Sequence, residues 1–149
     1  MAAPKRALIV GLRKLNPSLK EQMAAWVKPQ NLAYISGLTN KQLQQDLASM
    51  AASLESEGIR LENVLVEGEI DDAGIQRSCN QLRQHLCQSD AYDVVVLGAG
   101  IRGPLAHLPL FESLVNVTHR HAPSARIAFN TYPLDTAEAI KRALAAKEE

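Results

Sequence analysis

The sequence predicts an α/β protein, a three-layer sandwich in which a four-stranded parallel sheet lies between helices. Short apolar runs, typical of strands covered on both faces, alternate with stretches whose apolar residues recur at helical spacing. Capping residues, glycines and prolines separate these segments. No linker or internal repeat divides the 149 residues, so we expect one domain over residues 1–149.

The first strand is expected at residues 7–12, where a continuous apolar run ends near a glycine. A helix should follow from Pro17 to about Val27, because proline after asparagine is a helix start and apolar residues then recur on one face. Residues 28–38 contain Pro, Asn, Ser and Gly without a clear period. They are expected to form a surface loop, which is a candidate lid.

The middle of the chain repeats the strand-helix order. Thr39 opens a capping box, and the helix that follows should end at Gly58. Residues 59–67 mix apolar and polar side chains, as expected for an edge strand, and acidic residues then favour a helix over 71–88. Residues 92–97 give the strongest strand pattern of the chain, so this strand should be central.

The last third completes four strand-helix units. After a glycine-containing loop, Pro109 can open a helix that ends before Pro123. Residues 126–129 are expected to form the fourth strand, and Asp135 to begin a C-terminal helix. Right-handed crossovers between parallel strands favour the strand order 2-1-3-4.

A sheet of this order binds ligands at the carboxyl ends of its strands, at the switch point between the first and third strands. Four loops should meet there, and they supply the candidate binding positions: residues 11–14, 67–69, 98–103 and 130–132. Asn130 and Thr131 carry amide and hydroxyl groups that can orient a ligand, although the same residues are normal in a turn.

The loop after the third strand has the pattern G-x-G-x-x-G, formed by Gly98, Gly100 and Gly103. Such glycines let backbone amides approach a phosphate. The pattern departs from that of dinucleotide-binding proteins because Pro104 follows it and no acidic residue ends the next strand. Two interpretations remain, a turn whose glycines permit positive φ and close packing, and an anion or phosphate site.

Arginine favours the anion interpretation, because a guanidinium can hold a phosphate or carboxylate with two donors. Arg102 lies within the glycine loop, and Arg13 can join it from the first strand. The predicted ligand-binding residues are therefore Gly11, Arg13, Gly98, Gly100, Arg102, Gly103, Asn130 and Thr131.

Other chemistry has weaker support in the sequence. His107 follows the glycine loop and is the one catalytic candidate, as an acid or base. The acidic residues of segment 67–72 suit ribose or a hard cation, but helix-start charge explains them better, and no metal is expected. Cys79 and Cys87 lie about 12 Å apart on one expected helix, too far for a disulfide.

Charge argues against two classes of partner. Sixteen basic and sixteen acidic residues give a net charge of zero, so the broad positive field that binds nucleic acid or anionic membranes is missing. No apolar run approaches the length needed to span a bilayer, and we expect a cytoplasmic protein. Residues 1–45 nevertheless hold seven basic groups and one acid, enough to line an anion site locally or to help subunits meet.

The layout resembles flavodoxin-like and Rossmann-like single-domain proteins, and residues 95–100 are similar to nucleotide-binding Rossmann loops. Within that group the chain looks most like small bacterial proteins of unassigned activity, a resemblance that implies no catalytic residue. A response-regulator receiver would need acidic residues after the first strand, and this chain has Gly11, Leu12 and Arg13 there. Flavodoxin phosphate loops and thioredoxin-like cysteine pairs are also missing.

These observations favour a protein that binds a small anionic ligand, which is a nucleotide, phosphate or carboxylate, at the carboxyl edge of the sheet. The alternative is a non-enzymatic homodimer that buries a helix face or the segment around Trp26 and Tyr34. A small hydrolase or lyase is a third hypothesis, for which no nucleophile, base and orienting group can be assigned together. Whether the protein is an enzyme stays open.

Overall fold

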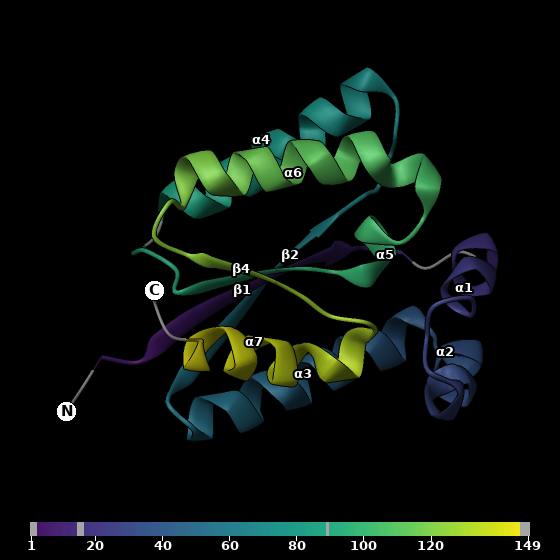
Figure 1. The fold of residues 1–149 in the computed structure, drawn as a ribbon, viewed down its shortest axis with the longest axis horizontal. Coiled ribbons are helices and arrows are strands. Elements are labelled where there is room, and N and C mark those ends of the chain that lie inside the picture. The colour runs from purple at the N-terminus through teal and green to yellow at the C-terminus, as the bar shows by residue number, and fades with distance from the viewer. Residues whose placement is uncertain (1–2, 15–16, 89, 147–149) are drawn as a thin grey trace.

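Four parallel strands form one sheet in the computed structural model, which describes residues 3–14, 17–88 and 90–146. The spatial order is β2-β1-β3-β4, as the sequence predicts (Figure 1). Parallel pairing aligns Leu12 with Val66 and Val10 with Leu97, so the carboxyl ends of the three strands lie at one edge. The strands are β1 (Lys5–Leu12), β2 (Ile59–Val66), β3 (Val94–Leu97) and β4 (Arg126–Phe129).

Helices cover both faces of the sheet and confirm the three-layer α/β fold. On one face lie α3 (Asn40–Ser56) and α7 (Thr136–Ala145), and on the other α4 (Asp72–Gln88) and α6 (Leu108–His121) (Figure 1). The central strands are accordingly apolar, and all four residues of β3 are buried. Among the described residues, none of the helices is both long and apolar enough to cross a membrane.

Shorter helices gather at the carboxyl end of the sheet (Figure 1). They are α1 (Pro17–Met23), α2 (Leu32–Gly37), α5 (Ala99–Arg102) and the 3-10 turns η1 (Pro29–Asn31), η2 (Leu105–His107) and η3 (Pro133–Asp135). Helix α1 ends before the predicted Val27, and the asparagine expected to cap it lies outside the described residues.

The prediction of a loop over residues 28–38 is wrong, because this segment forms η1 and α2. Ile35 and Leu38 are buried in the core, and their burial stabilises a helix too short to persist alone. Proline, asparagine and glycine in this segment suggest a loop locally, but packing against the rest of the fold overrides them.

Candidate functional site

The carboxyl edge of the sheet carries two hollows, one on each side of the end of β1. Strand β1 ends at Leu12, and β3 leads directly through Gly98 into α5. The loop predicted over residues 98–103 is thus largely a helical turn. Its flanking glycines have ordinary negative φ, −68° at Gly98 and −70° at Gly103, so the positive φ that the turn interpretation allowed is not used at these two positions.

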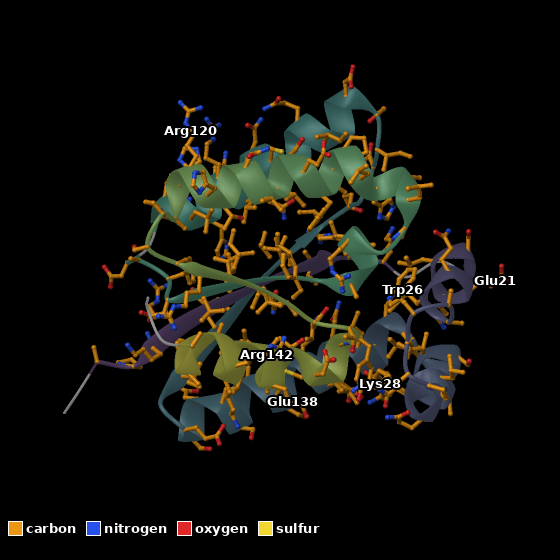
Figure 2. The ribbon with its side chains drawn as sticks, in the orientation of Figure 1. Glu21, Trp26, Lys28, Arg120, Glu138 and Arg142 are labelled. Atoms are coloured by element: carbon orange, nitrogen blue, oxygen red, sulfur yellow. The ribbon has the colours of Figure 1, made fainter. Side chains whose placement is uncertain are left out.

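Glycine is favoured at this turn because neighbouring groups approach the backbone closely. A Cβ atom on Gly103 would lie 2.3 Å from the Trp26 ring, and one on Gly98 would lie 3.1 Å from the carbonyl oxygen of Val10. Figure 2 shows Trp26 between α5 and the segment that carries α1 and α2. The close-packing interpretation of the glycine pattern therefore has direct geometric support.

The first hollow, which we term the apolar hollow, has a volume of about 50 Å³. Glycines at the ends of the central strands and leucines of α3 line it, among them Gly11, Gly98, Gly100, Leu43 and Leu47. Since one water molecule needs about 10–15 Å³ by this measure, the space suits a chain of three or four carbon atoms.

The second hollow, termed the polar hollow, is larger, at about 150 Å³. It collects side chains from four segments: Lys14 after β1, Ser18 and Gln22 on α1, Glu67 after β2, and His107 in η2. Gln22 donates a hydrogen bond to the Ser18 hydroxyl at 3.3 Å, so the two side chains are already oriented on one face of α1.

The charges of the polar hollow leave a positive excess. Arg13 forms an ion pair with Glu67 at 2.8 Å and neutralises its carboxylate. Lys14 has no ion pair with any described residue. The Nδ1 atom of His107 lies 3.0 Å from the carbonyl oxygen of Gly100. Because a carbonyl only accepts, Nδ1 donates this hydrogen bond.

Leu12 lines both hollows. Its side chain passes close to two glycines. A Cβ atom on Gly68 would lie 2.6 Å from Leu12 Cδ2, and one on Gly100 would lie 3.5 Å from Leu12 Cδ1. Gly68 also has a φ of 82°, a conformation that disfavours any other residue. The two missing side chains make the space that Leu12 fills.

Asn130 and Thr131, predicted to orient a ligand, instead bond within the protein. The Oδ1 atom of the Asn130 side chain accepts the Ala99 backbone N–H at 2.8 Å, and its Nδ2 atom donates to the Thr136 hydroxyl at 3.0 Å. Thr131 donates its backbone N–H to Asp135 at 2.9 Å, and its hydroxyl bonds to the same carboxylate. These bonds fasten the end of β4 to α5 and α7.

The two predicted arginines lie at opposite edges of the sheet. Arg102 donates from Nη2 to the Asn130 carbonyl oxygen at 2.7 Å and lies over the Phe129 ring, both at the end of β4. Arg13 pairs with Glu67, which follows β2. Since β2 and β4 are the outer strands, the two guanidinium groups do not share one anion site.

Two tyrosines close the side of the apolar hollow that faces α2. Tyr132 lines the hollow, and its ring meets that of Tyr34 edge-on at 5.8 Å. The Tyr34 hydroxyl donates to Asp46 at 2.5 Å. Burial and the Asp46 carboxylate raise the pKa of Tyr34 well above its usual value, and burial and Asp135 raise the pKa of Tyr132. Both phenols are therefore neutral at pH 7.

The acidic segment after β2 makes contacts with the first turns of helix α4. Asp71 accepts the Gly74 backbone N–H at 2.8 Å, and Glu69 pairs with Arg77. The described part of the chain holds no group of three or more His, Cys, Asp or Glu residues arranged to bind a metal. Helix-start charge thus has a geometric basis.

The site residues predicted from the sequence do not all lie in the same hollow. Gly11, Gly98, Gly100 and Asn130 line the apolar hollow, and His107 lines the polar hollow. Sequence reasoning missed Ser18 and Gln22, although their spacing of four on a helix that follows Lys14 placed them on one face.

The chain matches no protein-family model, and no curated protein matches its sequence.

Proposed function

We propose that the protein binds a small anionic metabolite, a carboxylate or a phosphate, in the polar hollow. One observation carries the proposal: Lys14, Ser18, Gln22 and His107 come from three segments of the chain and converge at the edge where sheets of this order bind ligands. Lys14 has no carboxylate partner among the described residues, so its charge is available to an anion.

The size of the hollow selects among anions. Pockets for drug-sized ligands have volumes of roughly 300–1,000 Å³, whereas the polar hollow has about 150 Å³. A short carboxylate or an inorganic phosphate fits this space, while the base of a nucleotide would lie outside it. The proposal therefore favours small acids over the nucleotides that the glycine pattern suggested.

The proposal is one of ligand binding and includes no catalysed reaction. The Ser18 hydroxyl accepts a hydrogen bond from Gln22, and it bonds to no base among the described residues. The groups needed for a hydrolase are therefore not assembled as nucleophile, base and orienting residue.

Nuclear magnetic resonance titrations with acetate and with phosphate test the proposal. Backbone amide signals of residues around Lys14 and His107 should shift, and Lys14→Ala should weaken binding at least tenfold, because a charged hydrogen bond contributes about 1.5–3 kcal/mol. Lys41→Ala, an exposed lysine on α3, is the matched control and should bind as the wild type does. No shift with either anion would contradict the proposal.

A second copy of the chain is the other candidate partner. Trp26 and Tyr34, which the sequence assigned to such an interface, are half-buried by contacts within the chain. Two neighbouring exposed leucines lie instead at η2 and the start of α6, where Leu105 is 86% exposed and Leu108 is 48% exposed. Sedimentation should show a dimer that Leu105→Asp converts to a monomer; a wild-type monomer at micromolar concentration would exclude this candidate.

A further inference from the structure

The two hollows meet at a single side chain. Leu12 lines both of them, and it packs against the backbones of Gly68 and Gly100. One hollow offers a cation and polar side chains. The other offers leucine side chains and glycine backbone. Leu12 is therefore the residue that the ionic lining and the apolar lining share.

We propose that the metabolite is a short aliphatic carboxylate that occupies both hollows. Its carboxylate lies beside Lys14, and its hydrocarbon tail lies against Leu43 and Leu47 once Leu12 has moved aside. This inference rests on the proposed function, because it takes the polar hollow as the place of the anionic group.

The lining of the apolar hollow supports a hydrocarbon occupant. The side chain of Asn130, a strongly polar group in that lining, already bonds to Ala99 and Thr136. The neighbouring phenol of Tyr34 donates to Asp46. A tail in this hollow would displace no hydrogen bond of these groups, and it would gain the transfer free energy of each buried methylene.

The volumes set the length of the tail. About 50 Å³ accommodates three or four carbon atoms beyond the carboxyl group, as in butanoate and pentanoate. A phosphate would leave the apolar hollow empty, and a long fatty acid would leave most of its chain in water. The protein should therefore discriminate by chain length.

The test is a series of NMR titrations with acetate, butanoate, pentanoate and octanoate. Affinity should rise about fourfold for each methylene that enters the apolar hollow, reaching a maximum near pentanoate. Pentanoate should also shift the methyl signals of Leu43 and Leu47, which acetate should leave in place.

Gly11→Val tests the location of the tail. A Cβ atom on Gly11 meets only the Leu65 side chain, at 3.4 Å, so valine fits the strand and fills the hollow. The ratio of pentanoate to acetate affinity should fall toward one. Gly37→Val is the matched control, because a Cβ atom there meets nothing within 4 Å, and it should keep the wild-type ratio. Leu12→Ala is a second variant, in which the joined hollows should raise the ratio further.

The outcomes separate the two proposals. Equal wild-type affinities for acetate and pentanoate, or an unchanged ratio in folded Gly11→Val, would overturn the shared-cavity inference while the anion site at Lys14 stands. If phosphate binds but neither acid does, the shared-cavity inference fails and the anion site stands. If neither the acids nor phosphate bind the wild type, the proposed function itself fails, and the inference fails with it.

Discussion

The two halves of the carboxyl edge use similar side chains in opposite ways. At the ends of β3 and β4, Asn130 is 4% exposed and its side chain bonds to the Ala99 amide and to Thr136, while Arg102 bonds to the Asn130 carbonyl oxygen. At the ends of β1 and β2, the Arg13 side chain is 51% exposed and pairs with an equally exposed glutamate. In the first half these polar side chains are bonded within the protein, and in the second half they are exposed to solvent.

Burial explains the difference. A buried amide or guanidinium that lacks a partner costs free energy. The Asn130 side chain has two partners, and Arg102 has one, although its Nε atom is buried without a partner among the described residues. An exposed lysine or arginine is solvated without a protein partner and can exchange water for a ligand. Residue type alone therefore does not distinguish a binding residue from a structural one.

The largest expected effect is that of Asn130→Ala. The substitution leaves the Ala99 N–H without its acceptor and the Thr136 hydroxyl without its donor in a buried place, so the free energy of unfolding should fall by about 3 kcal/mol. Urea denaturation measures the change. A loss below about 1 kcal/mol would show that water replaces these bonds and that the Asn130 side chain is not committed to them.

Arg102→Ala should have a smaller effect. It removes one hydrogen bond to Asn130 and a contact with the Phe129 ring, about 1 kcal/mol of stability, and it should leave acetate affinity unchanged. Urea denaturation and the same NMR titration check both results. A tenfold loss of acetate affinity would mean that the anion binds at Arg102, within the glycine pattern of residues 98–103. The contrast between the two halves would then be wrong.

Glu67→Gln should change stability least, by less than about 0.5 kcal/mol, because both partners of its ion pair with Arg13 are exposed. Acetate affinity should instead rise about threefold, since a negative charge leaves the polar hollow and Arg13 is released. Glu21→Gln, on the outer side of α1 (Figure 2), is the control and should change neither quantity. Weaker acetate binding in Glu67→Gln would mean that the carboxylate orients the site.

The sequence predicted the layers and the strand order because apolar runs and capping residues act locally. The runs at residues 7–12 and 92–97 mark strands covered on both faces wherever the helices lie. Helix α2 was not predicted, because the burial of Ile35 and Leu38 stabilises it rather than the helix propensity of its own residues.

The sequence predicted that the candidate site lies at the carboxyl edge of the sheet, but it did not distinguish which residues of that edge line a hollow. Gly11, Gly98 and Gly100 line a hollow, as their place at the ends of strands suggested. The internal partners of Asn130 lie 31 and six residues away in the sequence, so no local pattern shows that its side chain is committed. The roles proposed for Arg13 and His107 stay predictions until an anion is titrated.

The packing of Trp26 against Gly103 gives the molecule a built-in optical reporter. Trp26 is the only tryptophan of the chain, and it follows Gln22 and Met23, which line the polar and the apolar hollow. Its indole nitrogen is buried without a hydrogen-bond partner among the described residues. Any movement of α1 or α5 on binding would change the polarity around the indole, and intrinsic fluorescence would then report that movement in unlabelled protein.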